Sequence, residues 1–510
     1  MQRKRYGKVI AALIVSGVAL AAPKAWTESR TPPPPYDAVI DVQTPRGVPV
    51  TRPEQRKNQH DLSDVFMATK AIPISSALQH QPKDGKVTGF EFYRDPLNSE
   101  KPMMTFEEIY RKDVAERQKV NEAQRRLLES RYDLTPHLSQ DVKMTRGKPV
   151  AVGPTARLHR GMTWERLAAM SPDEVRKGEL FPYPPLPHPK QTTDGQVFPQ
   201  MQVKMFPRLQ RFDVDFDIPE AFLPEFPPAI FLQSRPELGD VSRGEVVSIN
   251  NFERLFKEIL TPVQLNGLQM LLTPFPQEEF NPTDDRKTAQ PSMGVACFDC
   301  HVNGHTTGQF HMSPDIRPQE RRFRLDTVSL RGMFNQQIHS SKRSLRSVED
   351  FTEFEFRTAY FNGDPIHAMK KGFPFIDRVH VPHMAQMQNM LDFPPAPKLD
   401  VVGRLDRSKA TRSEAAGEDI FYGKGKCGMC HMPPTFMDHQ MHDLKLERFL
   451  PVGDGPIKTF TLRGIKESPP YLHDGRCFTL EDTVEFFNLV LGLSLTGEEK
   501  TNLVAYLRVL

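Results

Sequence analysis

The sequence predicts a mainly α-helical protein: two related helical domains in the C-terminal half follow a proline-rich, irregular N-terminal region that contains one long helix. Three observations lead to this prediction. The pentapeptide pattern C-x-x-C-H occurs twice, and a second sequence pattern follows each copy at a constant spacing. The 510 residues also include 47 prolines, which interrupt regular helices outside these repeats.

The C-x-x-C-H pattern is the attachment signature of c-type haem. Its two cysteines form thioethers to one porphyrin edge, and the histidine that follows them is the proximal iron ligand. Zinc binding by the cysteine pairs is the alternative, but zinc motifs commonly lack the adjacent histidine and are rare in exported chains. We therefore predict two covalently bound haem c groups. The attachment and ligand residues are Cys297, Cys300 and His301 in the first motif, and Cys427, Cys430 and His431 in the second.

The N-terminus predicts export. Basic residues at positions 3–5 precede an apolar run over 9–22, which contains the A-x-A cleavage pattern at 19–21. We predict a signal peptide over residues 1–21 and a periplasmic location, because bacteria attach c-type haem after translocation. An uncleaved membrane anchor is the alternative. Since haem takes four of the five cysteines, we expect no internal disulfide, and Cys477 is interpreted as a small apolar core residue.

The charge balance excludes one class of partner. Lys and Arg together number 67 and Asp and Glu 64, so the formal net charge is only +3. Nucleic acid and anionic membrane surfaces attract strongly basic proteins. We therefore predict no nucleic-acid partner.

Residues 22–245 form the predicted proline-rich N-terminal region. Within it, a helix is predicted near 106–132, where apolar residues recur at helical spacing. Residues 140–240 alternate short polar runs with proline clusters, and we expect loops that wrap around another part of the chain. No catalytic motif occurs there. The helix-spaced apolar residues are Ile109, Val114, Val120, Ala123 and Leu127.

An internal repeat divides the C-terminal half into module 1 (246–395) and module 2 (396–510). The segment Thr327–Gly332 (T-V-S-L-R-G) matches Thr459–Gly464 (T-F-T-L-R-G) at a spacing of 132 residues. Each module is predicted to be a mostly helical, cytochrome c-like haem domain. We expect helices at 252–260, 262–272, 413–421, 479–491 and 497–510, the last with Thr496 as its N-cap.

The sixth iron ligands remain open at this stage. In module 1, His305 lies four residues after His301 and stays on the proximal side in a helix, whereas His311 could reach the distal side as ligand or base. Arg331 and Arg463 hold matched positions and pair either with haem propionates or with structural acids. Distal acid candidates are Glu353, Glu355 and Asp364, and candidate ligands in module 2 are Met437, Met441, His439, His442 and His473.

Motifs behind the second C-x-x-C-H carry a family resemblance. Thr459–Gly464, Pro470–Gly475 and Thr479–Glu481 read T-F-T-L-R-G, P-Y-L-H-D-G and T-L-E. With C-x-x-C-H they resemble the bacterial di-haem cytochrome c peroxidase and MauG superfamily over about residues 250–510; the N-terminal half has no counterpart in the short peroxidases. The resemblance implies two cytochrome c-like domains, often with a calcium ion between them. One haem accepts electrons and the other reacts with peroxide.

This chain departs from the family pattern in three places. The family's Met or Tyr ligand, fourteen residues beyond His473, falls on Phe487, which cannot bind iron. The family's tryptophan between the haems falls on Ser341, and the Gln and Glu of its peroxide pocket do not align. The tryptophans of this chain are Trp26 and Trp164, and the aromatic candidates to replace the missing one are Phe334 and Tyr360.

Three functions fit these residues. The first is a periplasmic enzyme that reduces hydrogen peroxide with electrons from a small cytochrome c or cupredoxin, haem 2 relaying them to haem 1, with His311 and Glu355 as distal catalytic candidates. The second is MauG-like oxidation of a protein or organic substrate, with the N-terminal region binding the partner. The third is an electron-transfer cytochrome with two six-coordinate irons. A homodimer is the candidate assembly, and calcium is a candidate cofactor.

Overall fold

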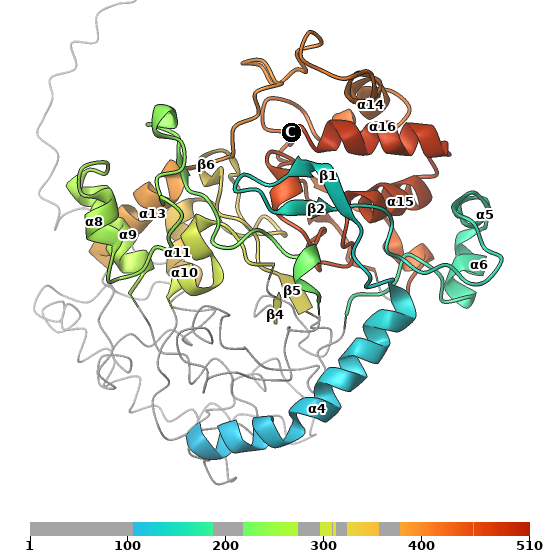
Figure 1. Cartoon of the computed structure of the whole chain (residues 1–510), viewed down its shortest axis with the longest axis horizontal. Helices are drawn as coiled ribbons and strands as arrows, with labels where there is room; N and C mark the ends of the chain where they lie inside the picture. The colour runs from blue at the N-terminus through green and yellow to red at the C-terminus, as the bar shows by residue number, and fades with distance from the viewer. Residues whose placement is uncertain are drawn as a thin grey trace, which may run out of the picture. The chain divides into compact units, whose positions relative to one another are not determined.

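The computed structural model describes residues 106–186, 218–273, 296–308, 310–312, 324–355, 378–451 and 453–510. All of them belong to one compact unit, Pro96–Leu510; the predicted signal peptide lies outside the described residues. Helices dominate the described part, and its strands form four two-stranded antiparallel pairs (Figure 1), which confirms the mainly α class. None of the described helices has the combination of length and apolar character that crossing a bilayer requires.

One hydrophobic core gathers buried residues between Ile230 and Leu391. Its helices are α8 (Phe252–Phe256), α9 (Pro262–Leu271), α11 (Val348–Phe354) and α13 (Val381–Met390), and α13 packs against both α9 and α11. Strands β3 (Phe231–Leu232) and β6 (Leu391–Asp392) pair and close this part of the chain on itself. The core therefore begins upstream of the predicted start of module 1.

The second core lies in module 2. It is built on α14 (Arg412–Tyr422), α15 (Leu480–Val490) and α16 (Gly497–Leu507), and α14 and α16 pack closely. Helices α14 and α16 begin with capping boxes at Thr411 and Thr496. The second of these confirms the predicted N-cap at Thr496. These helices match the predicted positions in module 2 and lie together in Figure 1, apart from α8, α9 and α13.

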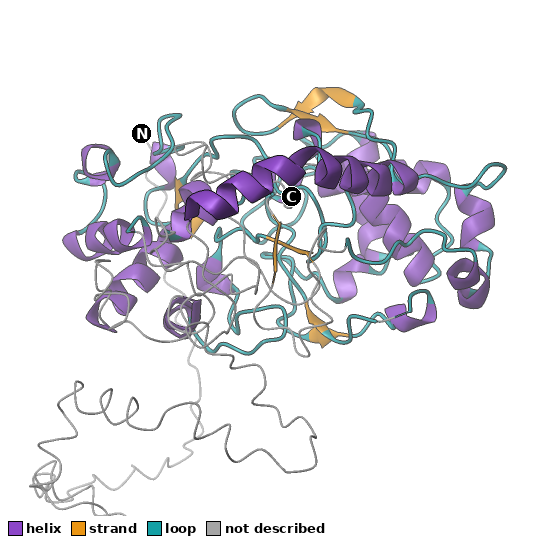
Figure 2. Ribbon diagram, turned by 90° about the horizontal axis from the view of Figure 1, so that it is seen from below, coloured by secondary structure: helices purple, strands orange, loops and turns teal. Residues whose placement is uncertain are grey.

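The N-terminal region shares the core of module 2. It contributes α4 (Phe106–Arg131), β1 (Leu138–Lys143), β2 (Pro149–Ala151), α5 (Trp164–Ala168) and α6 (Pro172–Lys177), and buried residues from Leu128 to Phe222 pack with residues of module 2. Helix α4 is the long helix in front in Figure 2. Tyr132, just beyond it, is fully buried and its hydroxyl donates to the Arg476 carbonyl at 2.7 Å. The described segments of the N-terminal region thus pack against module 2.

The buried carboxylate of Asp482 in module 2 binds the backbone of the N-terminal region. Asp482, in the first turn of α15, is fully buried and accepts hydrogen bonds from the Thr155 N–H (2.7 Å), the Thr155 hydroxyl (2.7 Å) and the Ala156 N–H (3.0 Å). The Phe478 N–H donates to the same carboxylate at 3.2 Å. Burial raises the pKa of Asp482, and these hydrogen bonds oppose the rise.

Backbone features recur at the spacing of 132 residues. Gly332 and Gly464 both have positive φ (75° and 70°) and precede the short 3-10 helices Met333–Asn335 and Ile465–Glu467. The isolated bridge between His339 and Leu345 recurs between Tyr471 and Cys477. Ser347 and Thr479 are the N-caps of α11 and α15.

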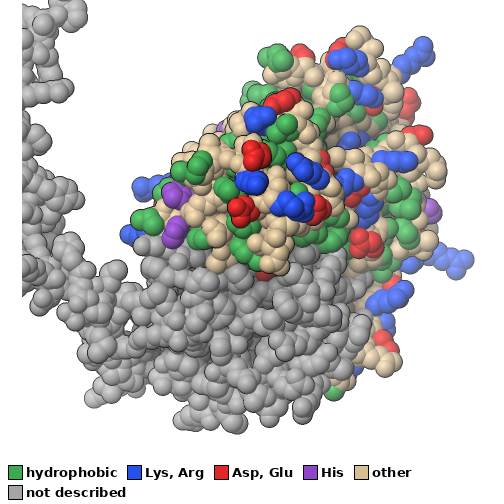
Figure 3. All heavy atoms as spheres, turned by 60° about the vertical axis from the view of Figure 1, so that its left-hand side comes forward, with side chains coloured by type: hydrophobic (Ala, Val, Ile, Leu, Met, Phe, Trp, Pro, Cys, Tyr) green, Lys and Arg blue, Asp and Glu red, His purple; other side chains and the backbone are tan. Residues whose placement is uncertain are grey.

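The remaining elements are short. They are α10 (Cys297–Cys300), β4 (Phe310–Met312), β5 (Arg324–Asp326), β7 (Met441–His442) and β8 (Ile457–Lys458), with further 3-10 helices at Glu220–Phe222, Pro236–Leu238, Val302–Gly304, Arg378–His380, Cys427–Met429 and Leu446–Arg448. On the face shown in Figure 3, basic and acidic side chains alternate without a large region of one sign, as the small net charge leads us to expect.

The crossing of α14 and α16 depends on Gly417. A Cβ atom there would lie 2.0 Å from the Asn502 carbonyl oxygen, so we expect Gly417→Ala to lower the free energy of unfolding by about 3 kcal/mol. Gly497→Ala, at the start of α16 where a Cβ meets nothing within 4 Å, is the matched control and should leave stability equal or slightly higher. Urea denaturation of both variants measures the difference; equal stabilities would contradict this packing.

Asp482→Ala should release the N-terminal region from module 2. Three buried N–H groups would lose their acceptor, and we expect a loss of about 3 kcal/mol in urea denaturation. Asp350 holds the matching position in α11 and is exposed, so Asp350→Ala should cost less than about 0.5 kcal/mol. A similar loss of stability in both variants would mean that the contacts of Asp482 with Thr155 and Ala156 do not contribute to stability.

Candidate haem sites

The first C-x-x-C-H motif forms one tight helical turn. In α10 the Asp299 carboxylate accepts from the Ala296 N–H at 2.8 Å, and the His301 N–H donates to the Cys297 carbonyl at 2.9 Å. The His301 Nδ1 lies 2.8 Å from the Val328 carbonyl oxygen. Because a carbonyl only accepts, Nδ1 must carry the proton, and Nε2 keeps the lone pair that a metal needs.

The second motif holds its histidine in the same way. The His431 N–H donates to the Cys427 carbonyl at 2.9 Å, and Nδ1 lies 2.8 Å from the Phe436 carbonyl oxygen. Burial lowers the pKa of both imidazoles, that of His301 to about 4, so both rings are neutral at pH 7. A neutral imidazole with Nδ1 tied to a carbonyl is the usual form of a metal-bound histidine.

The two tethers differ in origin. Phe436 lies only five residues beyond His431, and the backbone of Phe460, which matches Val328, also interacts with His431, so the second histidine is held within module 2. Val328 lies 27 residues beyond His301, so the first histidine depends on a separate segment, Val328–Arg331. The sequence pattern could not reveal these contacts, because the acceptors of the imidazole N–H groups are backbone carbonyl oxygens, which every residue carries.

A cavity of about 570 Å³ opens beside the second motif, within the size range of cofactor sites. It is largely apolar, as a porphyrin requires, and it reaches residues of module 1, including His305 and Arg331. Its lining includes Cys427, Cys430 and His431 with the apolar residues Phe421, Phe460, Leu462, Ile465, Tyr471, Val484, Phe486, Phe487, Leu503 and Leu507. The described residues around the second motif therefore fit a covalently bound haem.

The free cysteine thiols are poor zinc ligands in this setting. Burial raises the pKa of Cys297 and of Cys427 to about 12 and also raises those of Cys300 and Cys430. Zinc binds thiolates, which this environment disfavours, whereas a thioether carries no charge.

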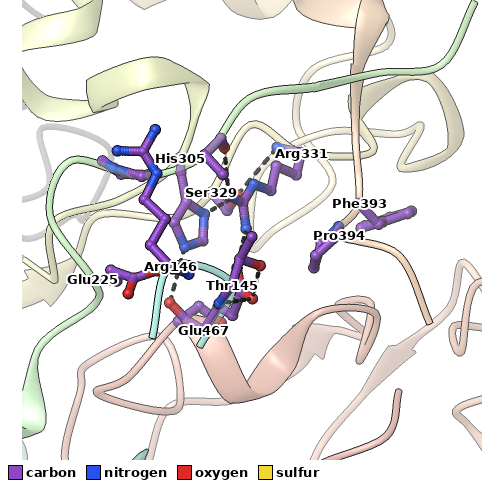
Figure 4. Close-up of polar contacts among 12 residues, drawn as sticks. Thr145, Arg146, Glu225, His305, Ser329, Arg331, Phe393, Pro394 and Glu467 are labelled. Atoms are coloured by element: carbon purple, nitrogen blue, oxygen red, sulfur yellow. Dashed lines mark hydrogen bonds and ion pairs between the residues drawn. The ribbon is translucent and has the colours of Figure 1, made fainter. Parts of the chain in front are cut away.

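His305 is not available as a sixth ligand. It is buried, with Nδ1 2.7 Å from the Ser329 hydroxyl and Nε2 3.0 Å from the Glu467 carbonyl oxygen (Figure 4). Since that carbonyl accepts from Nε2, Nδ1 must accept from Ser329, and both nitrogens are occupied.

The candidates in module 2 fall into two groups. His442 and His473 line the cavity; His442 Nε2 lies 2.6 Å from Asp438 Oδ2, and His473 Nε2 lies 3.8 Å from Asp454 Oδ2. His439 Nδ1 lies 3.0 Å from the Gln337 carbonyl oxygen. The cavity lining does not include Met437, which is buried, or Met441, which lies in β7.

The two distal candidates of module 1 stay predictions. His311 lies in β4, opposite Leu325 in β5, and its side chain is outside the description. Glu355 follows α11, is half-buried, and lies close enough to Cys297 for its charge to help raise the pKa of that thiol.

The matched arginines make structural contacts. Arg331 is buried, pairs with Glu467 at 3.0 Å and donates to the Ala229 carbonyl at 2.6 Å. Arg463 donates to the carbonyls of Leu510 (2.9 Å) and Pro394 (3.1 Å). Both also line the cavity. The sequence analysis did not identify Glu467 as the partner of Arg331. The matching position in module 1 is Asn335, and this replacement of an amide by a carboxylate could have pointed to Glu467.

Aromatic side chains lie where the two modules meet. Phe334 and Phe393 have ring centroids 6.3 Å apart, and the Arg463 guanidinium lies 5.5 Å from the Phe393 ring. Phe487 lines the cavity, where it offers only an apolar surface. Tyr360 lies outside the described residues.

Asp454, His473 and Asp474 form a cluster of residue types that can bind a metal ion, and the Arg476 side chain already pairs with its carboxylates. Oxygen and nitrogen atoms of Asp454, His473 and Asp474 lie within 4.8 Å of one another. The Arg476 guanidinium, fully buried, pairs with Asp474 and lies 3.1 Å from Asp454. Calcium binding therefore stays a prediction for this chain.

Together, the tethered histidines, half-buried cysteines and apolar cavity define a c-type haem protein. Comparison with curated proteins makes the class more particular. The chain is 28% identical over 151 residues to cytochrome-c peroxidase IdrP2 of Denitromonas iodatirespirans, 28% over 144 residues to the methylamine utilization protein MauG of Methylorubrum extorquens, and 28% over 151 residues to cytochrome c551 peroxidase of Nitrosomonas europaea. The C-terminal half is thus related to the bacterial cytochrome c peroxidases and MauG, as its motifs predicted, and the N-terminal region is unmatched.

These matches are partial. They cover 21–26% of this chain and 38–44% of the relatives, so the chain spans less than half of the length of each. No family model matches the chain. A solved MauG-like protein associated with microbial copper homeostasis has a TM-score of 0.31 at 18% identity, covering 42% of this chain and 81% of that one. The relation rests on the sequence matches and not on this structural likeness.

Removing one pair of cysteines should remove one haem. We expect the Cys427→Ala/Cys430→Ala variant to carry half the covalent haem of the unmodified chain, measured by pyridine haemochrome absorbance and intact mass. Cys477→Ala is the control, because Cys477 belongs to neither C-x-x-C-H motif and its loss should leave haem content unchanged. Full haem content in the double variant would contradict attachment at the second motif.

Proposed function

We propose that this chain is an exported di-haem oxidoreductase that reduces hydrogen peroxide with electrons from a small redox protein, a cytochrome c or a cupredoxin. One observation carries the proposal: in each C-x-x-C-H motif, Nδ1 of the histidine is hydrogen-bonded to a backbone carbonyl, as in the tautomer of a metal-bound histidine. Two of the relatives compared above are named as peroxidases, which supports this choice of reaction.

We infer further that modules 1 and 2 are repeats of one haem-binding unit. The recurring glycines, bridges and helix N-caps at a spacing of 132 residues support this inference. Under this proposal Cys297, Cys300 and His301 would hold one haem, and Cys427, Cys430 and His431 the other.

Haem iron supplies one-electron transfer and, where one axial position is open, a binding site for peroxide. The chain supplies the surroundings. His301 and His431 offer neutral imidazoles, and the lining of the cavity is largely apolar. Lys458 and Arg463 are cations in the cavity wall that favour carboxylates such as porphyrin propionates; burial lowers the pKa of Lys458 to about 8.

We assign the two modules different tasks, following the family resemblance. Module 2 would receive electrons from the donor protein, and module 1 would bind peroxide. A proton must reach the leaving oxygen when the O–O bond breaks, and His311 or Glu355 would hold it. Glu355 follows a helix of module 1 and lies near the first motif, which suits this role.

The periplasm is the proposed location. The predicted signal peptide over residues 1–21 and the requirement for haem attachment after translocation support it. A homodimer and a calcium ion remain proposals drawn from the family.

MauG-like oxidation of a protein or organic substrate is the second candidate. The similarity to MauG favours it, and the N-terminal region, which has no match among the relatives, would then contact the substrate. A pure electron carrier would instead have protein ligands on both sides of each iron.

Two measurements on the purified chain separate these functions. We expect the reduced protein to show a spectral shift with carbon monoxide, because peroxide reduction needs a displaceable axial site. We also expect added peroxide to oxidise a reduced small cytochrome c at least 100-fold faster than without the protein. No shift with carbon monoxide would favour the electron carrier. A shift without turnover of the cytochrome would favour the MauG-like enzyme.

A further inference from the structure

The buried carboxylate of Glu467 joins three parts of the chain. It pairs with Arg331 of module 1 at 3.0 Å, and it accepts from the Thr145 N–H of the N-terminal region at 3.0 Å as well as from the Thr145 hydroxyl. Glu467 itself belongs to module 2, in the 3-10 helix Ile465–Glu467. Figure 4 shows these side chains converging on Glu467.

The backbone of the same residue is held by His305. The His305 Nε2 donates to the Glu467 carbonyl at 3.0 Å, and Nδ1 accepts from the Ser329 hydroxyl at 2.7 Å. The Ser329 oxygen in turn accepts from the Arg331 N–H at 3.1 Å. His305 is 3% exposed, and burial lowers its pKa well below the usual value, so the ring is neutral and keeps this pattern of donor and acceptor.

Ser329 directly follows the residue that tethers the first haem histidine. The Val328 carbonyl oxygen lies 2.8 Å from His301 Nδ1. A short chain of contacts therefore leads from Thr145 through Glu467, His305 and Ser329 to the backbone that orients His301.

Module 2 lacks this arrangement. The residue that matches Ser329 is Thr461, and its hydroxyl donates to the Thr435 carbonyl at 2.6 Å, within the same module. His431 is tethered by Phe436, next to Thr435. The Thr461 hydroxyl thus bonds within its own module, whereas Ser329 is linked through His305 to Glu467 of module 2 and so to Thr145 of the N-terminal region.

We propose that His305 is a positioning residue that sets the orientation and hydrogen-bond strength of His301 by anchoring Val328–Arg331 to Glu467. In this arrangement the N-terminal region contributes to tuning the first haem through Thr145. The inference rests on the proposed function in one respect, that His301 is an iron ligand.

The hydrogen bond between His301 Nδ1 and the Val328 carbonyl determines whether the reduction potential of the first haem rises or falls. A hydrogen bond from Nδ1 to a carbonyl makes the imidazole a stronger donor, which stabilises the oxidised iron. When the anchor is lost, Val328 moves more freely and the bond weakens. The reduction potential of the first haem should therefore rise, and that of the second should not change.

The test is a spectroelectrochemical titration of both haems in the full chain. We expect His305→Ala to raise the potential of the first haem by about 59 mV or more, which is a tenfold change in the one-electron equilibrium constant. His305→Gln should restore most of the original value, because its amide can accept from Ser329 and donate to Glu467. Thr145→Val should shift the same potential in the same direction by less. The Cys427→Ala/Cys430→Ala variant assigns the two potentials.

Glu485→Gln is the matched control. It removes a buried ion pair with Lys500 (2.5 Å) that contacts neither haem histidine, so both potentials should stay unchanged. An unchanged first potential in His305→Ala, or an equal shift of both haems, would overturn the proposal. If His305→Ala does not fold, Ser329→Ala decides by the same criteria. A wild-type chain without haem would refute the proposed function, whereas two bound haems with an unchanged potential would refute only the role of His305.

Discussion

The buried ion pair between Arg331 and Glu467 is the interaction on which the arrangement of the described parts depends. Both side chains are about 5% exposed, so neither charge has water to solvate it. The net gain from such a pair is small, because desolvation offsets most of the attraction. Removing one partner is costly, however, since it leaves an uncompensated charge in the interior. The pair therefore joins module 1 to module 2 at a carboxylate that the Thr145 segment also contacts.

This arrangement explains how a proline-rich region with few regular elements can be ordered. The described buried residues between Leu128 and Phe222 belong to the same core as residues of module 2. Their backbone groups find partners in module 2, as the contacts of Thr155 with Asp482 and of Tyr132 with Arg476 show. A small haem domain has a limited apolar core, and the added segments enlarge it.

The histidines of the two C-x-x-C-H motifs have the same tautomer, but different parts of the chain hold them. Each histidine is neutral and tethered at Nδ1, so each is prepared for the same metal. The second histidine is held by backbone groups of its own module, and the first by a segment that His305 anchors to module 2. Unequal support of this kind allows one protein to hold two similar cofactors with different properties, because hydrogen bonding around the axial ligand is one of the factors that set a haem potential.

The sequence by itself determined the local features. The C-x-x-C-H motifs, the capped helices of module 2 and the mainly α class follow from residue type and short-range spacing. The second C-x-x-C-H motif, together with the T-F-T-L-R-G, P-Y-L-H-D-G and T-L-E segments, predicted the relatives. Helical capping and haem attachment act over a few residues, so a short pattern contains them completely.

Only the tertiary structure decided the roles of His305, Arg331 and Glu467. His305 was open as a ligand candidate until both ring nitrogens were found to be occupied, and Arg331 had two candidate partners until Glu467 was found 3.0 Å away. Glu467 stands 136 residues from Arg331 and 322 from Thr145, and no periodicity connects positions so far apart. Long-range contacts of buried polar groups depend on how the cores pack together, and that packing is a property of the whole fold.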